Sequence, residues 1–270
     1  MTTAAPTFSG SVPNTYHTFL GPLIFDAYAK DLAVRLSRLL KPNARVLELA
    51  AGTGIVTKQV LSALPPAASL TVTDLSEPML GVAKGSISDP RATFRAADAC
   101  KLPFQNQAFD ALFCQYGVMF FPDKIQAMKE ARRVLAPGGT YIFNIWDSFE
   151  HNPMPGTVQA SLVEQFPKDP PMFLAKMPYG HSDRAEIERY TRAGGFTNVK
   201  IESVAFPCIA PQAEDAARGF IEGTPVLAGL VERGITDPTP VRERAAKALT
   251  EKFGDKPCRA TMQAILVTAS

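Results

Sequence analysis

Apolar residues near the start of the chain recur at helical spacing, and those that follow gather in short runs. Over residues 25–40 they fit one face of an α-helix, which Pro42 ends. This face consists of Phe25, Tyr28, Leu32, Leu36, Leu39 and Leu40. Over residues 46–146, short apolar runs alternate with helical patterns. The alternation predicts a parallel sheet whose strands are connected by right-handed helical crossovers.

The alternation stops over residues 147–180, where prolines stand among methionines and aromatic residues. The later pattern predicts a helix at 183–193, a strand at about 197–206, a largely helical stretch at about 210–254 and a last strand at about 259–268. Residues 1–13 show no periodicity and are expected to form a loose tail, or an arm that becomes ordered on ligand binding. The expected parts are an N-terminal arm (1–23), a core (24–146), an inserted lid (147–181) and the C-terminal part of the core (182–270), which holds the helical insertion at about 210–254.

A strand, a glycine turn and a helix follow one another directly. Residues 46–49 form an apolar run that carries Glu48, as in a buried parallel strand with a carboxylate near its C-terminal end. Gly52 and Gly54 allow a sharp bend and the close approach of a ligand. From Ile55 onward the apolar positions have helical spacing. This order of elements is typical of nucleotide-binding folds.

The spacing of the glycines disfavours two common nucleotide sites. A dinucleotide fingerprint needs G-x-G-x-x-G, and alignment of its second glycine with Gly52 puts Ala50 first and the bulky Ile55 third. The close helix–strand contact that the third glycine permits is then lost, so NAD binding is disfavoured. Neither glycine is followed by Lys-Ser or Lys-Thr, as a triphosphate-binding loop requires.

The remaining pattern, E-x-A-x-G-x-G at residues 48–54, resembles motif I of the class I S-adenosylmethionine-dependent methyltransferases. It is most similar to the small-molecule branch that includes the ubiquinone and menaquinone biosynthesis enzymes. Ala50 stands where the family more often has glycine, which the loop tolerates if the backbone of Ala50 has a negative φ. The resemblance implies an α/β fold, a Rossmann-like, seven-stranded, mostly parallel sheet with helices on both faces and inserted lid segments. It also implies S-adenosyl-L-methionine as the cofactor, S-adenosyl-L-homocysteine as its product, and 24–146 as the cofactor-binding core.

Four later segments resemble the family in the same order. Residues 69–74 resemble the second strand, 96–99 the end of the third, 109–114 the fourth and 135–143 the turn into the fifth. The family uses the acid at the end of the second strand, here Asp74, to hold both ribose hydroxyls. It uses an acid at the place of Asp98 for the adenine amino group and the backbone of the next residue, here Ala99, for the ring. Taken alone, Asp74 also suits a cap for the helix that begins after Ser76.

By resemblance, the cofactor contacts come from the strand ends and from an aromatic residue of the N-terminal segment. They are Tyr16, Glu48, Ala50, Gly52, Thr53, Gly54, Asp74, Leu75, Met79, Asp98, Ala99 and Gln115. Glu48 would brace the glycine loop and face the amino group of the cofactor's methionine, directly or through water. Tyr16 would close over the methionine end, and Gln115 would lie beside the transferred methyl group.

Charge and cysteine content limit the classes of partner and the cellular compartment that the sequence fits. The 28 basic and 26 acidic residues give a formal net charge of +2 without a dense basic run, so nucleic acid is not the expected partner. Four separated cysteines and three histidines show no metal-ligand spacing, and unpaired thiols fit a reducing compartment. The sequence shows neither a signal peptide nor an apolar run of membrane-spanning length. We expect a cytoplasmic protein with a small-molecule substrate, without a metal and without stable membrane insertion. The oligomeric state stays open.

The expected chemistry is an in-line displacement, in which a nucleophile of the acceptor takes the methyl group from the sulfonium. Orientation and exclusion of water supply much of the acceleration, so a general base is optional. His151, His17 and His181 are candidates, and the sequence assigns none of them. The methionines, phenylalanines and prolines of the insertions favour a small, partly hydrophobic acceptor, such as a quinone-like, phenolic or polyketide compound.

Two alternatives stay open at this point. A protein that binds S-adenosylmethionine without methyl transfer fits a sequence in which no general base is assigned. An NAD-dependent oxidoreductase is the weaker alternative, because Ile55 occupies the place of the third fingerprint glycine.

Overall fold

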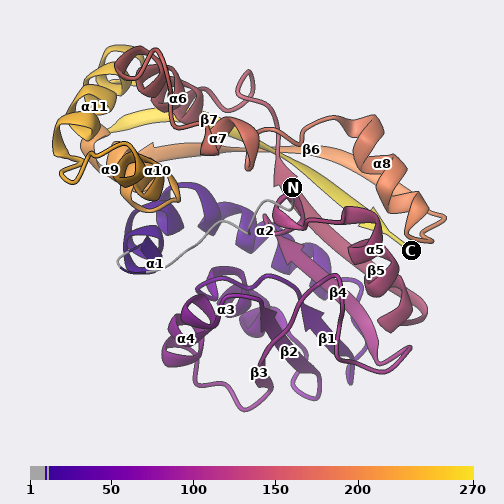
Figure 1. The fold of residues 1–270 in the computed structure, drawn as a ribbon. Coiled ribbons are helices and arrows are strands. Elements are labelled where there is room, and N and C mark those ends of the chain that lie inside the picture. The colour runs from indigo at the N-terminus through magenta and orange to yellow at the C-terminus, as the bar shows by residue number, and fades with distance from the viewer. Residues whose placement is uncertain (1–9, 11) are drawn as a thin grey trace. The chain divides into compact units, whose positions relative to one another are not determined.

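A computed structural model describes residue 10 and residues 12–270 of the chain (Figure 1). It contains a seven-stranded sheet in the order β3-β2-β1-β4-β5-β7-β6. The pairs β1–β2, β1–β4, β2–β3 and β4–β5 are parallel. The predicted α/β fold class, with a Rossmann-like and mostly parallel sheet, is therefore confirmed. The strand order reverses between β1 and β4, and ligands bind at the carboxyl ends of strands at such a point in open α/β sheets.

The strands are β1 (Arg45–Glu48), β2 (Ser69–Asp74), β3 (Ala92–Ala96), β4 (Phe109–Gln115), β5 (Leu135–Trp146), β6 (Val199–Ala210) and β7 (Cys258–Ala269). The helices are α1 (Val12–Thr15), η1 (Tyr16–Phe25), α2 (Asp26–Ser37), α3 (Ile55–Ala63), α4 (Glu77–Ser86), η2 (Val118–Phe120), α5 (Lys124–Val134), α6 (Pro153–Gln165), α7 (Phe173–Lys176), α8 (Arg184–Ala193), α9 (Ala213–Glu222), α10 (Val226–Glu232) and α11 (Thr239–Phe253). In the part of the chain that the structure describes, no helix is both long and apolar enough to cross a membrane.

The chain divides into two compact units. The first contains Met1–Asp26, Trp146–His181 and Ala205–Ala264. The second contains Ala27–Ile145, Ser182–Val204 and Ile265–Ser270. The glycine turn and the strand ends that resemble a cofactor site all belong to the second unit.

Buried apolar side chains from the strands and from α2 and α3 form one core in the second unit. Val46 on β1 and Leu70 on β2 are fully buried, and Leu32 from α2 and Val56 and Val60 from α3 join the same cluster. Each such side chain stabilises the fold by about 1.5–3 kcal/mol through its removal from water. The helical spacing of these positions in the sequence therefore reports which face of α2 and α3 packs on the sheet.

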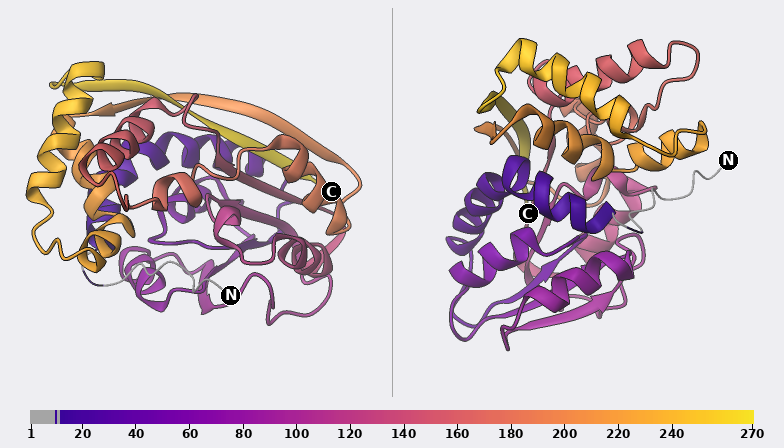
Figure 2. Two further views of the ribbon diagram at one scale, coloured as in Figure 1. Left: turned by 45° about the horizontal axis from the view of Figure 1, so that its top comes forward. Right: turned by 90° about the vertical axis from the view of Figure 1, so that its left-hand side faces the viewer.

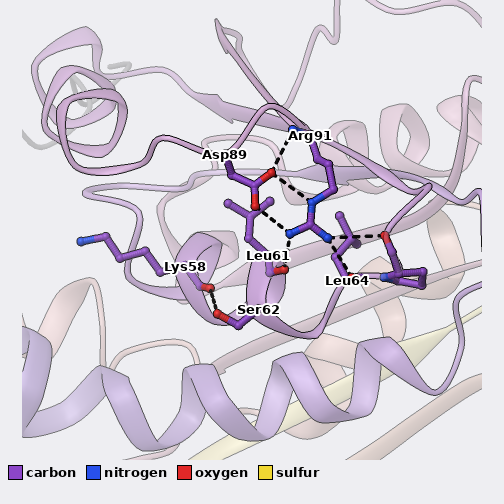
Figure 3. Close-up of polar contacts among 7 residues, drawn as sticks. Lys58, Leu61, Ser62, Leu64, Asp89 and Arg91 are labelled. Atoms are coloured by element: carbon purple, nitrogen blue, oxygen red, sulfur yellow. Dashed lines mark hydrogen bonds and ion pairs between the residues drawn. The ribbon is translucent and has the colours of Figure 1, made fainter.

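The C-terminal end of α3 is capped by a side chain from a later loop (Figure 3). Arg91 donates hydrogen bonds from Nη2 to the carbonyl of Leu61 at 2.7 Å and from Nη1 to that of Leu64 at 2.9 Å. These carbonyls have no partner within the helix. Asp89 accepts from Arg91 Nη2 at 2.6 Å and Nε at 3.0 Å, and the guanidinium lowers the pKa of Asp89 to about 2. Since α3 begins directly after the glycine turn, this cap fixes the helix on which the turn rests.

Helices α6, α9 and α11 pack side by side in the first unit (Figures 1 and 2). Arg242 on α11 forms ion pairs with Glu214 and Glu222 on α9. Two glycines let η1 approach α9 closely. A Cβ at Gly219 would lie 2.9 Å from Leu20 Cδ2, and one at Gly223 would lie 3.1 Å from the backbone nitrogen of Tyr16. The stretch at about 210–254 thus contains three helices that pack on one another and on η1.

A buried asparagine ties the chain after β5 to β7 within the first unit. Asn152 donates from Nδ2 to the carbonyls of Asp147 at 2.9 Å, Ser148 at 3.1 Å and Gln263 at 2.9 Å. Its Oδ1 accepts from the amide of Gln263 at 3.0 Å. Because a buried amide group needs all of its partners, Asn152 fixes where the chain leaves β5.

The entry into β5 differs from the expectation of a turn at residues 135–143. The strand already pairs at Leu135, and its register shifts so that Phe109 faces Leu135 while Ala111 faces Thr140. Gly138 has a φ of +76°. The Pro-Gly-Gly sequence therefore forms an irregularity within a strand and does not precede it.

Two further boundaries differ from the expected ones, and one lies outside the described residues. β3 ends at Ala96, before Asp98, and β6 continues to Ala210. Of the tail expected at 1–13, residues 1–9 and 11 are outside the described part of the chain, while Val12 and Pro13 begin α1.

Replacement of Arg91 by alanine should lower the free energy of unfolding by about 1 kcal/mol, since it leaves the last carbonyls of α3 without their charged donor. Urea denaturation followed by circular dichroism measures the loss. Arg38→Ala is the matched control, because Arg38 is exposed directly after α2 and should change the stability by less than about 0.5 kcal/mol. Equal losses in the two variants would contradict the capping role of Arg91.

Candidate functional site

After β1 the chain turns through left-handed backbone at three alternate residues. φ is +53° at Ala50, +58° at Gly52 and +81° at Gly54. The condition of a negative φ at Ala50 is therefore not met, and the turn forms with a left-handed alanine. For an alanine this conformation costs about 1–2 kcal/mol, so the surrounding packing must hold Ala50 in it.

Backbone hydrogen bonds hold the first part of this turn between the two neighbouring strands. The amide of Leu49 donates to the carbonyl of Phe113 on β4 at 2.9 Å. The amide of Ala51 donates to the carbonyl of Thr73 on β2, also at 2.9 Å. The turn is thus a continuation of the sheet and is fixed before it reaches α3.

The two glycines of the turn lie against α4. A Cβ at Gly54 would be 2.9 Å from Ile87 Cδ1 and 3.0 Å from Ala83 Cβ, so no larger residue fits without displacement of α4. A Cβ at Gly52 would be 3.6 Å from Met79 Cε. Met79 itself is buried and lies beside the turn, and its contact with a cofactor stays a prediction.

The left-handed Ala50 fits because the residue that faces it is a glycine. A Cβ at Gly117, just after β4, would lie 2.4 Å from Ala50 Cβ and 2.6 Å from Cys114 Sγ. Tyr116, directly before this glycine, also has a positive φ of +57°. Ala50 and Gly117 are therefore complementary in size, and their contact joins the loop after β1 to the loop after β4.

Asp74, at the end of β2, receives backbone amides from both sides. The amide of Gly52 donates to Oδ2 at 2.7 Å, and that of Ser76 donates to Oδ1 at 2.7 Å. The amide of Leu75 also interacts with this carboxylate. A carboxylate has about four acceptor positions, so acceptor capacity remains for a ligand hydroxyl. Burial raises the pKa of Asp74, and these amides oppose the rise. The cap of α4 is the hydroxyl of Ser76, which accepts from the amide of Met79 at 3.4 Å.

The ends of β2 and β3 place an apolar side chain beside a second acid. The amide of Ala97 donates to the carbonyl of Asp74 at 3.0 Å, so the segment after β3 is bonded to the end of β2. The exposed Asp98 accepts from the amide of Cys100 at 2.8 Å, and Ala99 between them is buried. Leu75 exposes 63% of its surface. An exposed apolar side chain near an acid suits the face and the edge of a heterocyclic base.

Glu48, the last residue of β1, is fully buried under the turn. Its Oε2 accepts from the hydroxyl of Thr57 on α3 at 2.7 Å, while Oε1 has no hydrogen-bond partner. Its backbone carbonyl accepts from the hydroxyl of Thr73 at 2.5 Å. Burial raises the pKa of Glu48 to about 8. The hydrogen bond from Thr57 opposes the rise, and the nearby Asp74 adds to it.

The residues after β4 are fixed by the next strand. Gln115 ends β4 opposite Asn144 of β5. The amide of Tyr116 lies 3.0 Å from the backbone carbonyl of Asn144 and 3.2 Å from its Oδ1. The ring of Tyr116 packs edge-on against Tyr28, with ring centroids 5.7 Å apart.

The expected cofactor residues other than Tyr16 all lie in the second unit, at or just after the carboxyl ends of β1 to β4, except Met79, which lies on α4. In this unit Thr53, like Glu48, is buried within the turn. Tyr16 starts η1 in the first unit, where its ring stacks on Phe25 with centroids 4.9 Å apart. Its contact with a cofactor therefore stays a prediction. His17, His151 and His181 also belong to the first unit, and no catalytic role is assigned to them.

A series of aromatic rings lies within the first unit. Trp146 is buried, with its ring centroid 6.1 Å from that of Phe25 and 6.0 Å from that of Tyr179. Phe149 continues the series at 4.9 Å from Tyr179. The single tryptophan is thus part of an aromatic cluster that begins where β5 ends.

Three residues that hold the site have no place in the motif, namely Thr57, Thr73 and Gly117. Thr57 lies on the buried face of α3 with Val60 and Leu61, and a polar residue in an apolar stripe is the signal that could have revealed it. A glycine directly after a predicted strand is the corresponding signal for Gly117. The hydroxyl of Thr73 could not have been placed without knowledge of the register.

The donor set limits the ligands that the site can hold. Asp74 offers acceptors to a diol, and the unpaired oxygen of Glu48 offers one to a positive group. The turn at residues 49–54 contains no lysine or arginine. A phosphate would face two carboxyl groups without a compensating cation, so the arrangement favours a nucleoside that carries a positive charge.

Known proteins with sequences similar to this chain include methyltransferases. Residues 46–139 match the family described as "Methyltransferase domain". A mitochondrial 2-methoxy-6-polyprenyl-1,4-benzoquinol methylase of Caenorhabditis elegans is 30% identical over 183 residues, which are 61% of this chain and 62% of that protein. The ubiquinone/menaquinone biosynthesis C-methyltransferase UbiE of Bartonella quintana is 38% identical over 104 residues, which are 37% of this chain and 40% of that protein. The matches thus span less than two thirds of either relative.

Solved structures share the fold. The phosphoethanolamine N-methyltransferase 2 of Haemonchus contortus, in complex with phosphomonomethylethanolamine and S-adenosylhomocysteine, has a TM-score of 0.61 to this chain. The identity is 17%, and the match covers 95% of this chain and 56% of that chain. At this identity the likeness supports the arrangement of strands and helices.

Replacement of Gly117 by alanine should destabilise the protein by about 1–3 kcal/mol, because the new methyl group overlaps Ala50 and Cys114. Ala50→Gly in the same chain should recover part of this loss by removing one of the two overlaps. Chemical denaturation measures both variants. Gly81→Ala on α4 is the control, since nothing lies within 4 Å of its added Cβ. A Gly117→Ala chain as stable as this control would disprove the size-complementary contact.

Glu48→Gln should make the protein more stable than the wild type by an amount that grows with pH. The pKa of Glu48 is raised from 4.5 to about 8, so its contribution is fully present below pH 4.5 and is lost as the pH rises through about 8. Over that window the wild type should lose up to about 1.4 kcal/mol per pH unit relative to the glutamine variant. Urea denaturation from pH 5 to pH 8 measures the difference.

The matched variant is Thr57→Val, which keeps the carboxyl group and removes its hydrogen bond. It should therefore retain the pH dependence of the wild type. A difference between Glu48→Gln and wild type that does not change with pH would show that Glu48 is charged throughout this range.

Proposed function

We propose that this chain, which carries a class I S-adenosylmethionine-dependent methyltransferase domain, transfers a methyl group from S-adenosylmethionine to a small, partly hydrophobic acceptor. The observation that carries the proposal is the bond from the Gly52 amide to Asp74, which sets a diol-binding acid against the glycine turn. The family match covers residues 46–139, and the methyl transfer by the whole chain is what we propose.

The residues present fit S-adenosylmethionine. The carboxylate of Asp74, which backbone amides hold in place, keeps acceptor capacity for a ribose diol. The exposed Leu75 and Asp98, which follow β2 and β3, suit the face and the edge of a base. The unpartnered Oε1 of Glu48 suits the positive amino group. When bound, S-adenosylmethionine supplies an activated methyl group on a sulfonium sulfur.

The chain's own part in the reaction is to orient and to exclude water. The glycine turn after β1 is held by backbone hydrogen bonds to β2 on one side and to β4 on the other. It therefore needs little rearrangement to hold a ligand. Gln115 and Tyr116 are fixed against Asn144 at the end of β4, the strand end from which the reacting centre would be lined. Orientation of two reactants alone can supply about 7–11 kcal/mol of barrier reduction, so no catalytic base is assigned.

The proposed acceptor class rests on the first unit and on the relatives. Trp146, Tyr179 and Phe149 form an aromatic series, and Met172 and Met177 lie in the same segment. Flexible methionines and aromatic rings favour an apolar ligand with few polar groups. The quinol and quinone methylases with which the chain shares sequence support such an acceptor. The lid role of 147–181 and of about 210–254, and closure by Tyr16, are parts of this proposal.

Location and partners are proposed on chemical grounds. All four cysteines are unpaired in the structure, which supports a reducing, cytoplasmic environment. The near balance of basic and acidic residues supports a small-molecule substrate over nucleic acid. We propose neither a metal nor a particular oligomeric state.

S-adenosylmethionine and S-adenosylhomocysteine should each raise the melting temperature, whereas NAD should not. A ligand specific to the folded state stabilises it by about 2.7 kcal/mol at a concentration of one hundred times Kd. Asp74→Ala should abolish most of this shift, because it removes the acceptors for the diol. Glu77→Gln, which alters an exposed acid in the first turn of α4, is the matched control and should keep the shift.

The outcomes separate the alternatives. A shift with NAD alone would overturn the proposal in favour of an oxidoreductase. A shift with S-adenosylmethionine, together with no S-adenosylhomocysteine formed from any quinol, phenol or polyketide acceptor, would favour a binding protein without methyl transfer. An unchanged shift in Asp74→Ala would remove Asp74 from the site.

A further inference from the structure

Glu48 is a fully buried carboxyl group, and the motif that contains it does not specify whether it carries a proton. Its Oε2 has one partner, the hydroxyl of Thr57, and its Oε1 has none. Within the described part of the chain the structure records no ion pair for Glu48. A carboxyl group in this setting is costly to ionise, because it has lost water and has gained a single neutral donor.

The groups that face Glu48 from the neighbouring elements provide no positive charge. Asp74 at the end of β2 is itself an acid and disfavours a second negative charge. On β4 the thiol of Cys114 interacts with Glu48, and burial raises the pKa of that thiol to about 12. On α3 the facing group is the hydroxyl of Thr57. The pKa of Glu48 near 8 agrees with this surrounding.

We propose that Glu48 holds a proton in the ligand-free protein and releases it to solvent when the ammonium group of S-adenosylmethionine or S-adenosylhomocysteine binds. This inference rests on the proposed function. It makes Glu48 a positioning residue that selects ligands by the positive amino group, and it makes the affinity of the site depend on pH.

The physical reason is that a bound cation supplies the positive charge that the protein does not place beside Glu48. A positive charge close to a carboxyl group lowers the pKa of that group by 1–3 units or more when both are shielded from water. The proton that leaves Glu48 passes to the buffer, and the ligand keeps the proton on its own amine. The pair formed is then a carboxylate and an ammonium, with no unpaired charge left under the turn.

The affinity for an amino-acid-bearing ligand should therefore rise with pH. When one proton must leave for binding, the affinity increases about tenfold per pH unit below the pKa of the releasing group. The rise should end near pH 8, both because Glu48 is then ionised in the free protein and because the amine of the ligand begins to lose its own proton.

The test is isothermal titration calorimetry of the wild-type chain with S-adenosylhomocysteine at pH 6.5, in two buffers with different enthalpies of ionisation. The dependence of the measured enthalpy on the buffer gives the number of protons released. For a pKa of Glu48 lowered from about 8 by 1–3 units, the expected value lies between about 0.2 and about 0.9. The control ligand is 5′-methylthioadenosine, which keeps the nucleoside and the sulfur and lacks the ammonium group. It should bind with no proton release.

Glu48→Gln is the matched variant, because it keeps the size of the side chain and removes the titrating group. It should bind S-adenosylhomocysteine with no proton release and with an affinity that stays constant from pH 6 to pH 7.5. Difference infrared spectroscopy of the wild type gives a second measurement that does not require the variant to fold. The band of a protonated, buried carboxyl group should disappear on addition of S-adenosylhomocysteine and should persist with 5′-methylthioadenosine.

Failure of this inference differs from failure of the proposed function. If neither S-adenosylmethionine nor S-adenosylhomocysteine binds the wild type, the proposed function itself is wrong. If S-adenosylhomocysteine binds without release of a proton, or if Glu48→Gln releases as many protons as the wild type, the site stands and the role of Glu48 is overturned.

Discussion

The hydrogen bond from the Gly52 amide to the carboxylate of Asp74 is the contact on which the candidate site depends. It connects the turn after β1 to the end of β2, and the amide of Ser76 holds the other oxygen of the same carboxylate. Hydrogen bonds to an ionised acceptor are shorter and stronger than neutral ones, in keeping with the 2.7 Å of both. The acid is thereby aimed by backbone groups, while its remaining acceptor positions stay available to a ligand.

Asp74 and Glu48 are both carboxyl groups, but their surroundings differ in how well they stabilise the ionised form. Asp74 has amide donors on both oxygens and keeps partial access to solvent. Glu48 is sealed beneath the turn with a single hydroxyl as its donor. Burial favours the neutral form of each, but only Asp74 has backbone amides that oppose it. In the proposed function, Asp74 would therefore accept from a neutral diol, and Glu48 would face a group that carries a positive charge.

The fold could be predicted, as could the strand, the turn and the acid that lie together in the structure, because these depend on local patterns. The apolar run before Glu48 and the glycines at 52 and 54 identify the strand and the turn, and strand order then brings Asp74 beside them. The φ of Ala50 could not be predicted, because it depends on Gly117, which belongs to a distant segment. The Pro-Gly-Gly sequence was predicted as a turn because its pairing with β4 is a tertiary property.

Ala50 gives the departure from the family pattern a physical meaning. A glycine would adopt the left-handed conformation without strain and would also visit many others. An alanine disfavours this conformation, so the loop holds it there only because Gly117 makes room for its methyl group and the surrounding packing retains it. The strain of about 1–2 kcal/mol is then offset by packing between the loops after β1 and β4. Because Gly117 directly follows Tyr116 and Gln115, the same contact that fixes the cofactor turn also fixes the strand end that would line the acceptor side of the second unit.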